Sequence, residues 1–277
     1  MSAFRVQRRY QGPVKAIVLD WAGTTVDFGS RAPVLAVMEA FRRADVPVTL
    51  EQARGPMGMA KRDHLRVMLE MPEVAQRWQQ AYGRPPSPSD IDRLYTQFLP
   101  LQKEILATNS QVIPGCVKAV EECRSRGIAI GSSTGYTQEL MDVIVPLVRA
   151  QGYNPDAIVC ASDVSPGRPA PWMCFENARR LGVYPMQAIV KVDDTTVGIE
   201  AGLNAGMWTV GISRSGNLVG LSEDELRKLS PQDQAQRVEA AAAELYRCGA
   251  HFVADTIAEL PQILREINDQ LRRGLCP

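Results

Sequence analysis

Short apolar runs recur along the chain and alternate with segments of helical periodicity. The runs lie at 14–19, 128–131, 157–160, 188–192, 207–212 and 251–254. The helical patterns between and after them lie at 116–126, 137–151, 171–181, 197–205 and 256–272. Short strands that alternate with helices in this way favour an α/β domain built on a mostly parallel sheet. We therefore expect a Rossmann-like parallel-sheet core.

Polar residues follow several of these runs at the point where each run ends. Asp20 follows the first run, a Ser-Ser-Thr cluster at 132–134 follows the second, and Asp193 and Asp194 follow the fourth. Ligands of open parallel sheets bind beyond the carboxyl ends of the strands. The sequence therefore predicts that these side chains form one site at that edge.

Residues 28–112 interrupt the alternation of strands and helices. This stretch has helical periodicity at 31–44, 61–71 and 91–108, and prolines at 72, 85, 86 and 88 punctuate its middle. A helical block inserted after the first strand is typical of a cap over the site. We predict an α/β core made of 1–27 and 113–277, with a helical cap at 28–112.

Composition excludes several classes of function. Lys+Arg and Asp+Glu are both 31, so the basic excess of a broad nucleic-acid surface is absent. Two histidines rule out a multi-histidine metal centre, and the six cysteines contain no C-x-x-C pair. The first fourteen residues lack the apolar run of a signal peptide, and no stretch approaches the roughly 18 apolar residues of a membrane span. We therefore expect a cytoplasmic enzyme without membrane or nucleic-acid partners.

The first candidate motif is DWAGTTVD, which begins at Asp20. A carboxylate at a strand end on a glycine-containing turn is suited to act as a nucleophile or a magnesium ligand. The same residue can also simply end a strand, and the motif alone does not decide between these readings. Ser132 and its neighbours offer donors to a phosphate oxygen, Arg168 offers positive charge, and the hard oxygens of Asp194 suit Mg²⁺.

These four elements, in this order and each near a strand end, resemble the haloacid dehalogenase superfamily of phosphotransferases over about residues 14–212. The resemblance implies Asp20 as nucleophile, Ser132 as phosphate ligand, Arg168 as the cationic group and Asp194 as a metal ligand. In the phosphatases of that superfamily the second residue after the nucleophile is an aspartate that protonates the leaving oxygen. Here Ala22 occupies that position, and only its backbone carbonyl can still bind Mg²⁺.

A carbon leaving group removes the need for that acid, provided that an electron acceptor takes up the electron pair of the broken P–C bond. A protonated imine between a lysine and a carbonyl substrate accepts them and becomes an enamine. Lys61 opens a predicted helix of the cap after a glycine-containing turn, although a lysine at a helix start is usually solvated. Imine formation needs a neutral amine, so burial or nearby cations, such as Arg62 and the helix N-terminus, must lower the Lys61 pKa.

Ala22 together with Lys61 resembles the phosphonoacetaldehyde hydrolase family, also called phosphonatases. The segments that carry the likeness read DWAGTTVDFGSRAP, PMGMAKRDH, GSSTGYT, GRPAPWM, GVYPM and NAGMWTVG. The resemblance implies cleavage of phosphonoacetaldehyde to acetaldehyde and phosphate, through a Schiff base on Lys61 and a phosphoryl group on Asp20. It also implies Mg²⁺ held by Asp20, the Ala22 carbonyl and Asp194, and a homodimer.

Several assignments stay open at this point. Met57 can pack against the aldehyde and His64 can relay protons, but methionine is more often core filler and a lone histidine more often structural. Some family members carry an acidic residue at the position of Gly198, so the role of Asp193 is undefined. A phosphatase or phosphomutase with another acid, such as Asp27, is the alternative activity, and a phosphate-binding module without turnover is the non-enzymatic one.

Overall fold

The computed structural model describes residues 9–277, and it contains one six-stranded sheet whose paired strands are all parallel. The first eight residues of the predicted 1–27 segment lie outside the described part. The strands follow the order β3-β2-β1-β4-β5-β6. They are β1 (Ala16–Leu19), β2 (Ala129–Thr134), β3 (Ala157–Cys160), β4 (Ile189–Asp193), β5 (Trp208–Ile212) and β6 (Phe252–Ala254). The predicted α/β fold with a parallel sheet is confirmed.

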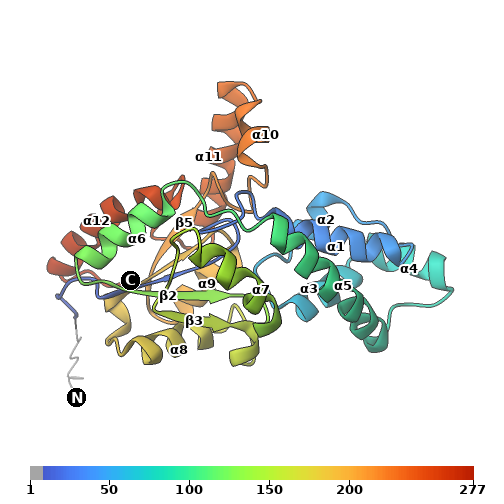
Figure 1. Ribbon diagram of the computed structural model, residues 1–277, viewed down its shortest axis with the longest axis horizontal. Helices are drawn as coiled ribbons and strands as arrows, with labels where there is room; N and C mark the ends of the chain where they lie inside the picture. Colours follow the sequence, from blue (N-terminus) through green and yellow to red (C-terminus); the bar gives the residue numbers. More distant parts are fainter. Residues whose placement is uncertain (1–8) are drawn as a thin grey trace, which may run out of the picture.

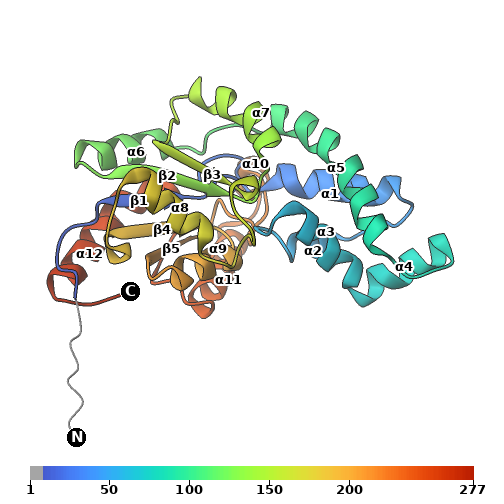
Figure 2. The same cartoon turned by 90° about the horizontal axis from the view of Figure 1, so that it is seen from below.

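The sheet is covered by helices on both faces, which is why its strands read as continuous apolar runs. In β1, Ile17 and Leu19 pack into one hydrophobic cluster, whereas Ala16 and Val18 pack into another on the opposite face. The first cluster includes residues of α6 (Cys116–Ser125), α7 (Gln138–Arg149) and α12 (Leu260–Arg272). The second includes residues of α8 (Trp172–Leu181) and α9 (Thr196–Asn204). Figures 1 and 2 show the resulting layers, with the inserted helices beyond one end of the strands.

The inserted block contains five helices with a hydrophobic cluster of their own. They are α1 (Arg31–Arg43), α2 (Leu50–Arg54), α3 (Lys61–Glu70), α4 (Pro72–Tyr82) and α5 (Pro88–Thr108). Helices α2 and α4 were not expected from the sequence. Pro72 and Pro88 begin α4 and α5 and do not interrupt them, because a proline in the first helical turn loses no intrahelical hydrogen bond. The exact limits of the two domains stay a prediction.

The chain enters and leaves the block through two segments that lie side by side. The Asp27 N–H donates to the carbonyl of Gln111 at 2.9 Å, and the Ile113 N–H donates to the carbonyl of Thr25 at 2.9 Å. On the entering segment, Asp27, Gly29 and Ser30 all have positive φ. The two connections therefore form one narrow, sharply turned junction between the helical block and the sheet.

A second excursion lies between β5 and β6, where α10 (Glu223–Arg227) and α11 (Pro231–Arg247) project away from the sheet (Figure 1). The loop that leads into it, 213–222, returns over the end of β4 before α10 begins. No helix within residues 9–277 combines the length and the apolar character that a membrane crossing requires.

Candidate active site

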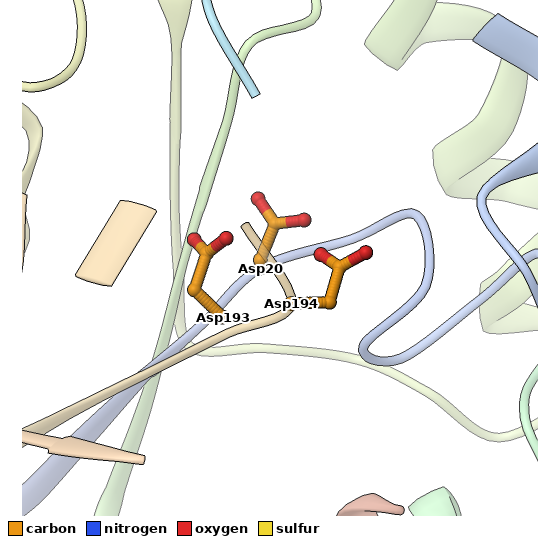
Figure 3. Close-up of side chains that lie close together, drawn as sticks. All are labelled: Asp20, Asp193 and Asp194. Atoms are coloured by element: carbon orange, nitrogen blue, oxygen red, sulfur yellow. The ribbon is translucent and has the colours of Figure 1, made fainter. Parts of the chain in front are cut away.

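Asp20 and Asp194 meet at the point where the strand order of the sheet reverses. Strand β1 lies next to β4, and the Asp20 N–H donates to the carbonyl of Val192 at 2.9 Å. The carboxyl ends of these two adjacent strands therefore carry Asp20, Asp193 and Asp194 into one place (Figure 3). Such a reversal is where open α/β sheets form their ligand crevice.

These three carboxylates form a cluster that fits a divalent metal ion. Each offers an oxygen, and the three oxygens lie within 4.8 Å of one another. Burial and the neighbouring carboxylates raise the pKa of Asp194 well above its usual value, and burial together with Asp193 raises the pKa of Asp20. Crowded, buried carboxylates of this kind gain most when a cation neutralises them, and hard oxygen ligands suit Mg²⁺.

Asp194 is held from two sides by backbone and side-chain donors. The Asn217 N–H donates to its Oδ2 at 2.7 Å, and the Thr24 hydroxyl lies 3.4 Å from its Oδ1. Gly23 passes so close that a Cβ there would lie 2.1 Å from Oδ2, and its φ of +83° also favours glycine. Ala22, one residue earlier, lines the same cavity as Asp20. The turn after β1 is therefore fitted closely around the Asp194 carboxylate.

Asp193 is fully buried and its carboxylate is held by cations. Its Oδ2 lies 2.6 Å from Lys191 Nζ and 3.2 Å from a terminal nitrogen of Arg168, and its Oδ1 accepts from the Thr195 N–H and hydroxyl. A Cβ at Gly198 would lie 2.0 Å from the Asp193 Cγ. The carboxylate of Asp193 therefore occupies the space that a side chain at 198 would take.

Arg168 lies between the two buried carboxylates. One terminal nitrogen donates to Asp20 Oδ1 at 2.6 Å and also to the carbonyl and hydroxyl oxygens of Ser133 at 2.8 and 2.9 Å. The other lies 3.2 Å from Asp193. Its positive charge lowers the pKa of Asp20 against the effect of burial, so it favours the ionised, nucleophilic form.

Lys61 is buried in the same cavity, with 4% of its surface exposed, and is not a solvated lysine at a helix start. Its Nζ lies 3.7 Å from Met57 Sδ and 5.7 Å from the centre of the Tyr136 ring. Desolvation lowers its pKa to about 8, and Arg168 contributes in the same direction. Arg62, which the sequence offered as the cation beside it, instead pairs with Asp92 at the surface.

His64 lies one helical turn beyond Lys61 but does not line the cavity. Its Nε2 is 2.9 Å from the Ala53 carbonyl, so Nε2 carries the hydrogen and donates. Its Nδ1 has no partner among the described residues. Burial lowers the His64 pKa to about 3, so the ring stays neutral and acts first as a brace between α3 and α2.

The phosphate-binding turn differs from the expectation at one residue. Ser132 is fully buried, its hydroxyl donates to the carbonyl of Ala157 at 3.2 Å, and it is not among the residues around the cavity. Thr134, the last residue of β2, does line the cavity together with Gly135. The sequence placed the polar cluster at the end of β2, where the structure has it, but Thr134 borders the cavity and Ser132 does not.

The helical block closes over these residues. The cavity is lined by Asp20, Ala22, Ser30, Pro33, Met57, Gly58, Lys61, Thr134, Gly135, Tyr136, Arg168 and Thr195. A Cβ at Gly58 would lie 2.4 Å from the Thr195 Oγ1, and one at Gly135 would lie 2.7 Å from the Met59 carbonyl oxygen. The loop before α3 therefore packs directly on the core, and Lys61 and Asp20 border the same small space.

Known proteins resemble this chain along its full length. Residues 14–206 match the family model of haloacid dehalogenase-like hydrolases. A phosphonoacetaldehyde hydrolase-like protein of Syntrophobacter fumaroxidans is 47% identical and a phosphonoacetaldehyde hydrolase of the same organism is 46% identical, with all of both chains covered in each case. The crystal structure of a phosphonoacetaldehyde hydrolase-like protein from Oleispira antarctica superposes with a TM-score of 0.97 at 42% identity, again over all of both chains. A β-phosphoglucomutase from Clostridium difficile shares the fold alone, with a TM-score of 0.64 at 16% identity over 93% of this chain and 98% of that one.

Proposed function

The chain belongs to the phosphonoacetaldehyde hydrolases among the haloacid dehalogenase-like hydrolases, and we propose that it cleaves the P–C bond of phosphonoacetaldehyde to give acetaldehyde and phosphate. The observation that carries the mechanism is the buried amine of Lys61 in the cavity that Asp20 also lines. With a pKa of about 8, about a tenth of this amine is neutral at pH 7 and can attack an aldehyde. An ordinary exposed lysine would have far less neutral amine.

The reaction begins at the aldehyde carbon. The Lys61 amine adds to it, water leaves, and a protonated imine forms. Asp20 then attacks phosphorus, the P–C bond breaks, and its electron pair enters the iminium to give an enamine and an aspartyl phosphate. Protonation of the enamine carbon gives the imine of acetaldehyde. Water hydrolyses this imine and the aspartyl phosphate, which restores Lys61 and Asp20.

The remaining cavity residues bind and orient the phosphonate. Arg168 offsets negative charge on the phosphoryl group and on Asp20, and the Thr134 hydroxyl is placed to donate to a phosphoryl oxygen. Asp20, Asp194 and the Ala22 carbonyl oxygen would hold Mg²⁺, which would supply positive charge to the phosphoryl oxygens. Met57 gives the amine an apolar neighbour, which disfavours its charged form.

The phosphatase alternative is weaker because, among residues 9–277, Asp20 is the only carboxylic acid that lines the cavity. Asp27 was the candidate for that acid. Its Oδ2 accepts from the Ala32 N–H at 2.8 Å at the start of α1, and Asp27 does not line the cavity. Burial in the junction between the helical block and the sheet raises the pKa of Asp27 to about 7.

Borohydride reduction in the presence of phosphonoacetaldehyde tests the proposal. We expect a two-carbon adduct on Lys61 that depends on substrate, and loss of turnover in Lys61→Arg. Lys191 is an internal control, because it is also fully buried but pairs with Asp193 outside the cavity. Turnover with no adduct, together with normal activity in Lys61→Arg, would refute the Schiff base. Turnover of simple phosphate esters in place of the phosphonate would support the phosphatase reading.

Two further expectations belong to this proposal. Paired subunits and a cytoplasmic location were inferred from the family resemblance and from composition, and both stay predictions. Sedimentation analysis of the full chain tests the first, since a single species of one subunit mass would contradict it.

A further inference from the structure

Arg54 is the last residue of α2. The hydrogen bonds of its guanidinium all go to oxygens in the core or at the edge of the helical block. One terminal nitrogen donates to the Gly29 carbonyl at 3.0 Å and to the carbonyl and side-chain oxygens of Asn217 at 3.3 and 3.1 Å. The other donates to the Gly220 carbonyl at 2.6 Å. Gly29 lies in the entering segment of the junction, and the other two acceptors lie in the core loop 213–222. None of the acceptors is a carboxylate, so the guanidinium is held by hydrogen bonds to neutral carbonyl and amide oxygens and not by an ion pair.

The core loop that receives Arg54 also holds Asp194. The Asn217 N–H donates to Asp194 Oδ2 at 2.7 Å. Asn217 therefore accepts hydrogen bonds from Arg54 through its two oxygens and donates one to the Asp194 carboxylate through its backbone nitrogen. Ser215 of the same loop donates from its hydroxyl to the Gly23 carbonyl at 2.8 Å, and its own carbonyl accepts from the Gly29 N–H at 2.8 Å. The loop thus connects the junction, the turn after β1 and the predicted metal ligand.

The fit between Arg54 and this loop is close. A Cβ at Gly220 would lie 2.6 Å from the Arg54 guanidinium carbon, and Gly220 has a φ of +68°. The bonds to Gly220 and Asn217 exist only while α2 lies against the core. Movement of the helical block away from the sheet must break them and leaves the loop without its outer support.

We propose that Arg54 is a latch that couples closure of the helical block to the placement of the Asp194 carboxylate. When the block closes, the guanidinium fixes the 213–222 loop, and the Asn217 N–H then holds Asp194 in its metal-binding orientation. Arg54 touches neither the cavity nor the carboxylate, so it is a positioning residue. The inference rests on the proposed metal role of Asp194. It predicts that the resting enzyme binds a divalent ion more tightly when the latch is intact.

The test compares Arg54→Met, which keeps the apolar stem, with Arg77→Met. Arg77 is the matched control, because it is a cap arginine that supports the same helix α2 from inside the block, through the Pro47 carbonyl and the Gln52 side chain. Mn²⁺ binding to resting enzyme is measured by electron paramagnetic resonance, and hydrogen exchange is measured across 213–222 in metal-free protein. Loss of a group that orients a metal ligand typically weakens binding about 10- to 100-fold.

We expect a Mn²⁺ dissociation constant about 10-fold or more higher in Arg54→Met, with faster exchange in the loop, and values within about 2-fold of wild type in Arg77→Met. Arg54→Lys should recover only part of the affinity, because a single ammonium cannot span acceptors that a planar fork reaches. Unchanged binding and exchange in Arg54→Met would overturn the latch, as would an equal loss in Arg77→Met.

A second variant keeps the test decisive if Arg54→Met does not fold. Asn217→Ala removes the side-chain acceptor of Arg54 and keeps the backbone N–H that holds Asp194, so we expect a smaller loss of affinity in the same direction. Affinity equal to wild type there would count against the latch. These readouts need no substrate. Wild-type protein that binds no Mn²⁺ would defeat the proposed metal role, whereas wild-type binding that is indifferent to residue 54 would defeat the latch alone.

Discussion

Replacing Lys61 by methionine should make the protein more stable while it removes the Schiff base. The Lys61 pKa falls from 10.5 to about 8 because burial disfavours the charged ammonium. At pH 7 the folded protein therefore carries an unfavourable charge whose free-energy cost, from this difference of pKa, is about 3 kcal/mol. Methionine fills the space of the lysine stem without that charge.

The pH dependence of this gain has a defined sign. A lysine whose pKa is depressed in the folded state destabilises the fold fully below the folded pKa, and the cost fades as pH rises from about 8 towards 10.5. The advantage of Lys61→Met should thus be about 3 kcal/mol at pH 7 and about half of that at pH 9.5. Urea unfolding of metal-free protein at the two pH values measures both.

Lys103→Met is the control for this experiment. The Lys103 side chain is 41% exposed and pairs with Glu139 at 2.9 Å at the surface, so its replacement should change stability by less than about 1 kcal/mol. A Lys61→Met protein that is less stable than wild type at pH 7, or whose advantage does not depend on pH, would refute the buried-charge reasoning. The Schiff-base mechanism would then lose its source of neutral amine.

Two other predictions concern the carboxylate cluster and the phosphate turn. Asp193→Gly should cost about 3–5 kcal/mol of stability because it leaves the buried ammonium of Lys191 without its carboxylate and removes one of the two carboxylates that Arg168 contacts. Gly198→Asp should also be destabilising because both carboxylates need one space. The double variant should recover most of the loss in urea unfolding, and strictly additive losses would show that the two positions do not share a site. Thr134→Val should lower kcat/KM about 10- to 100-fold, through loss of a hydrogen bond to a charged group. It should also cost about 1 kcal/mol of stability, because the Thr134 hydroxyl accepts from the buried Tyr136 N–H at 3.1 Å. Ser132→Ala should cost about 1 kcal/mol of stability and leave kcat/KM nearly unchanged, and the reverse pattern would return the phosphate role to Ser132.

The fold, and the positions of Asp20, Asp194 and Lys61 beside one another, could be predicted from the sequence for a physical reason. Parallel strands that are buried on both faces appear in the sequence as continuous apolar runs. Because the carboxyl ends of such strands meet at one edge of the sheet, the sequence alone places Asp20 and Asp194 together. Lys61 was found because chemistry required a lysine once Ala22 had removed the acid. Neither step needed knowledge of side-chain orientation.

The other assignments depended on orientation or on contacts between distant segments. Ser132 and Thr134 lie in one short cluster, and only the end of β2 decides which hydroxyl borders the cavity. The role of Asp193 depends on the space above Gly198. Arg54 carried no motif, since its acceptors are widely separated in the chain and meet only in the folded protein.

The junction at 27 and 111–113 has a consequence for how such an enzyme can acquire new substrates. Because the helical block leaves and rejoins the core through hydrogen-bonded neighbouring segments, an exchange of everything between them would leave the chain path of the core unchanged. Contacts such as those of Arg54 and of the loop before α3 with the core would have to form anew. The phosphoryl-transfer groups would stay behind on the sheet, and the amine that chooses an aldehyde would leave with the block. The groups that would select the substrate and the groups that would break the bond therefore lie in two separate parts of the chain, which the junction connects.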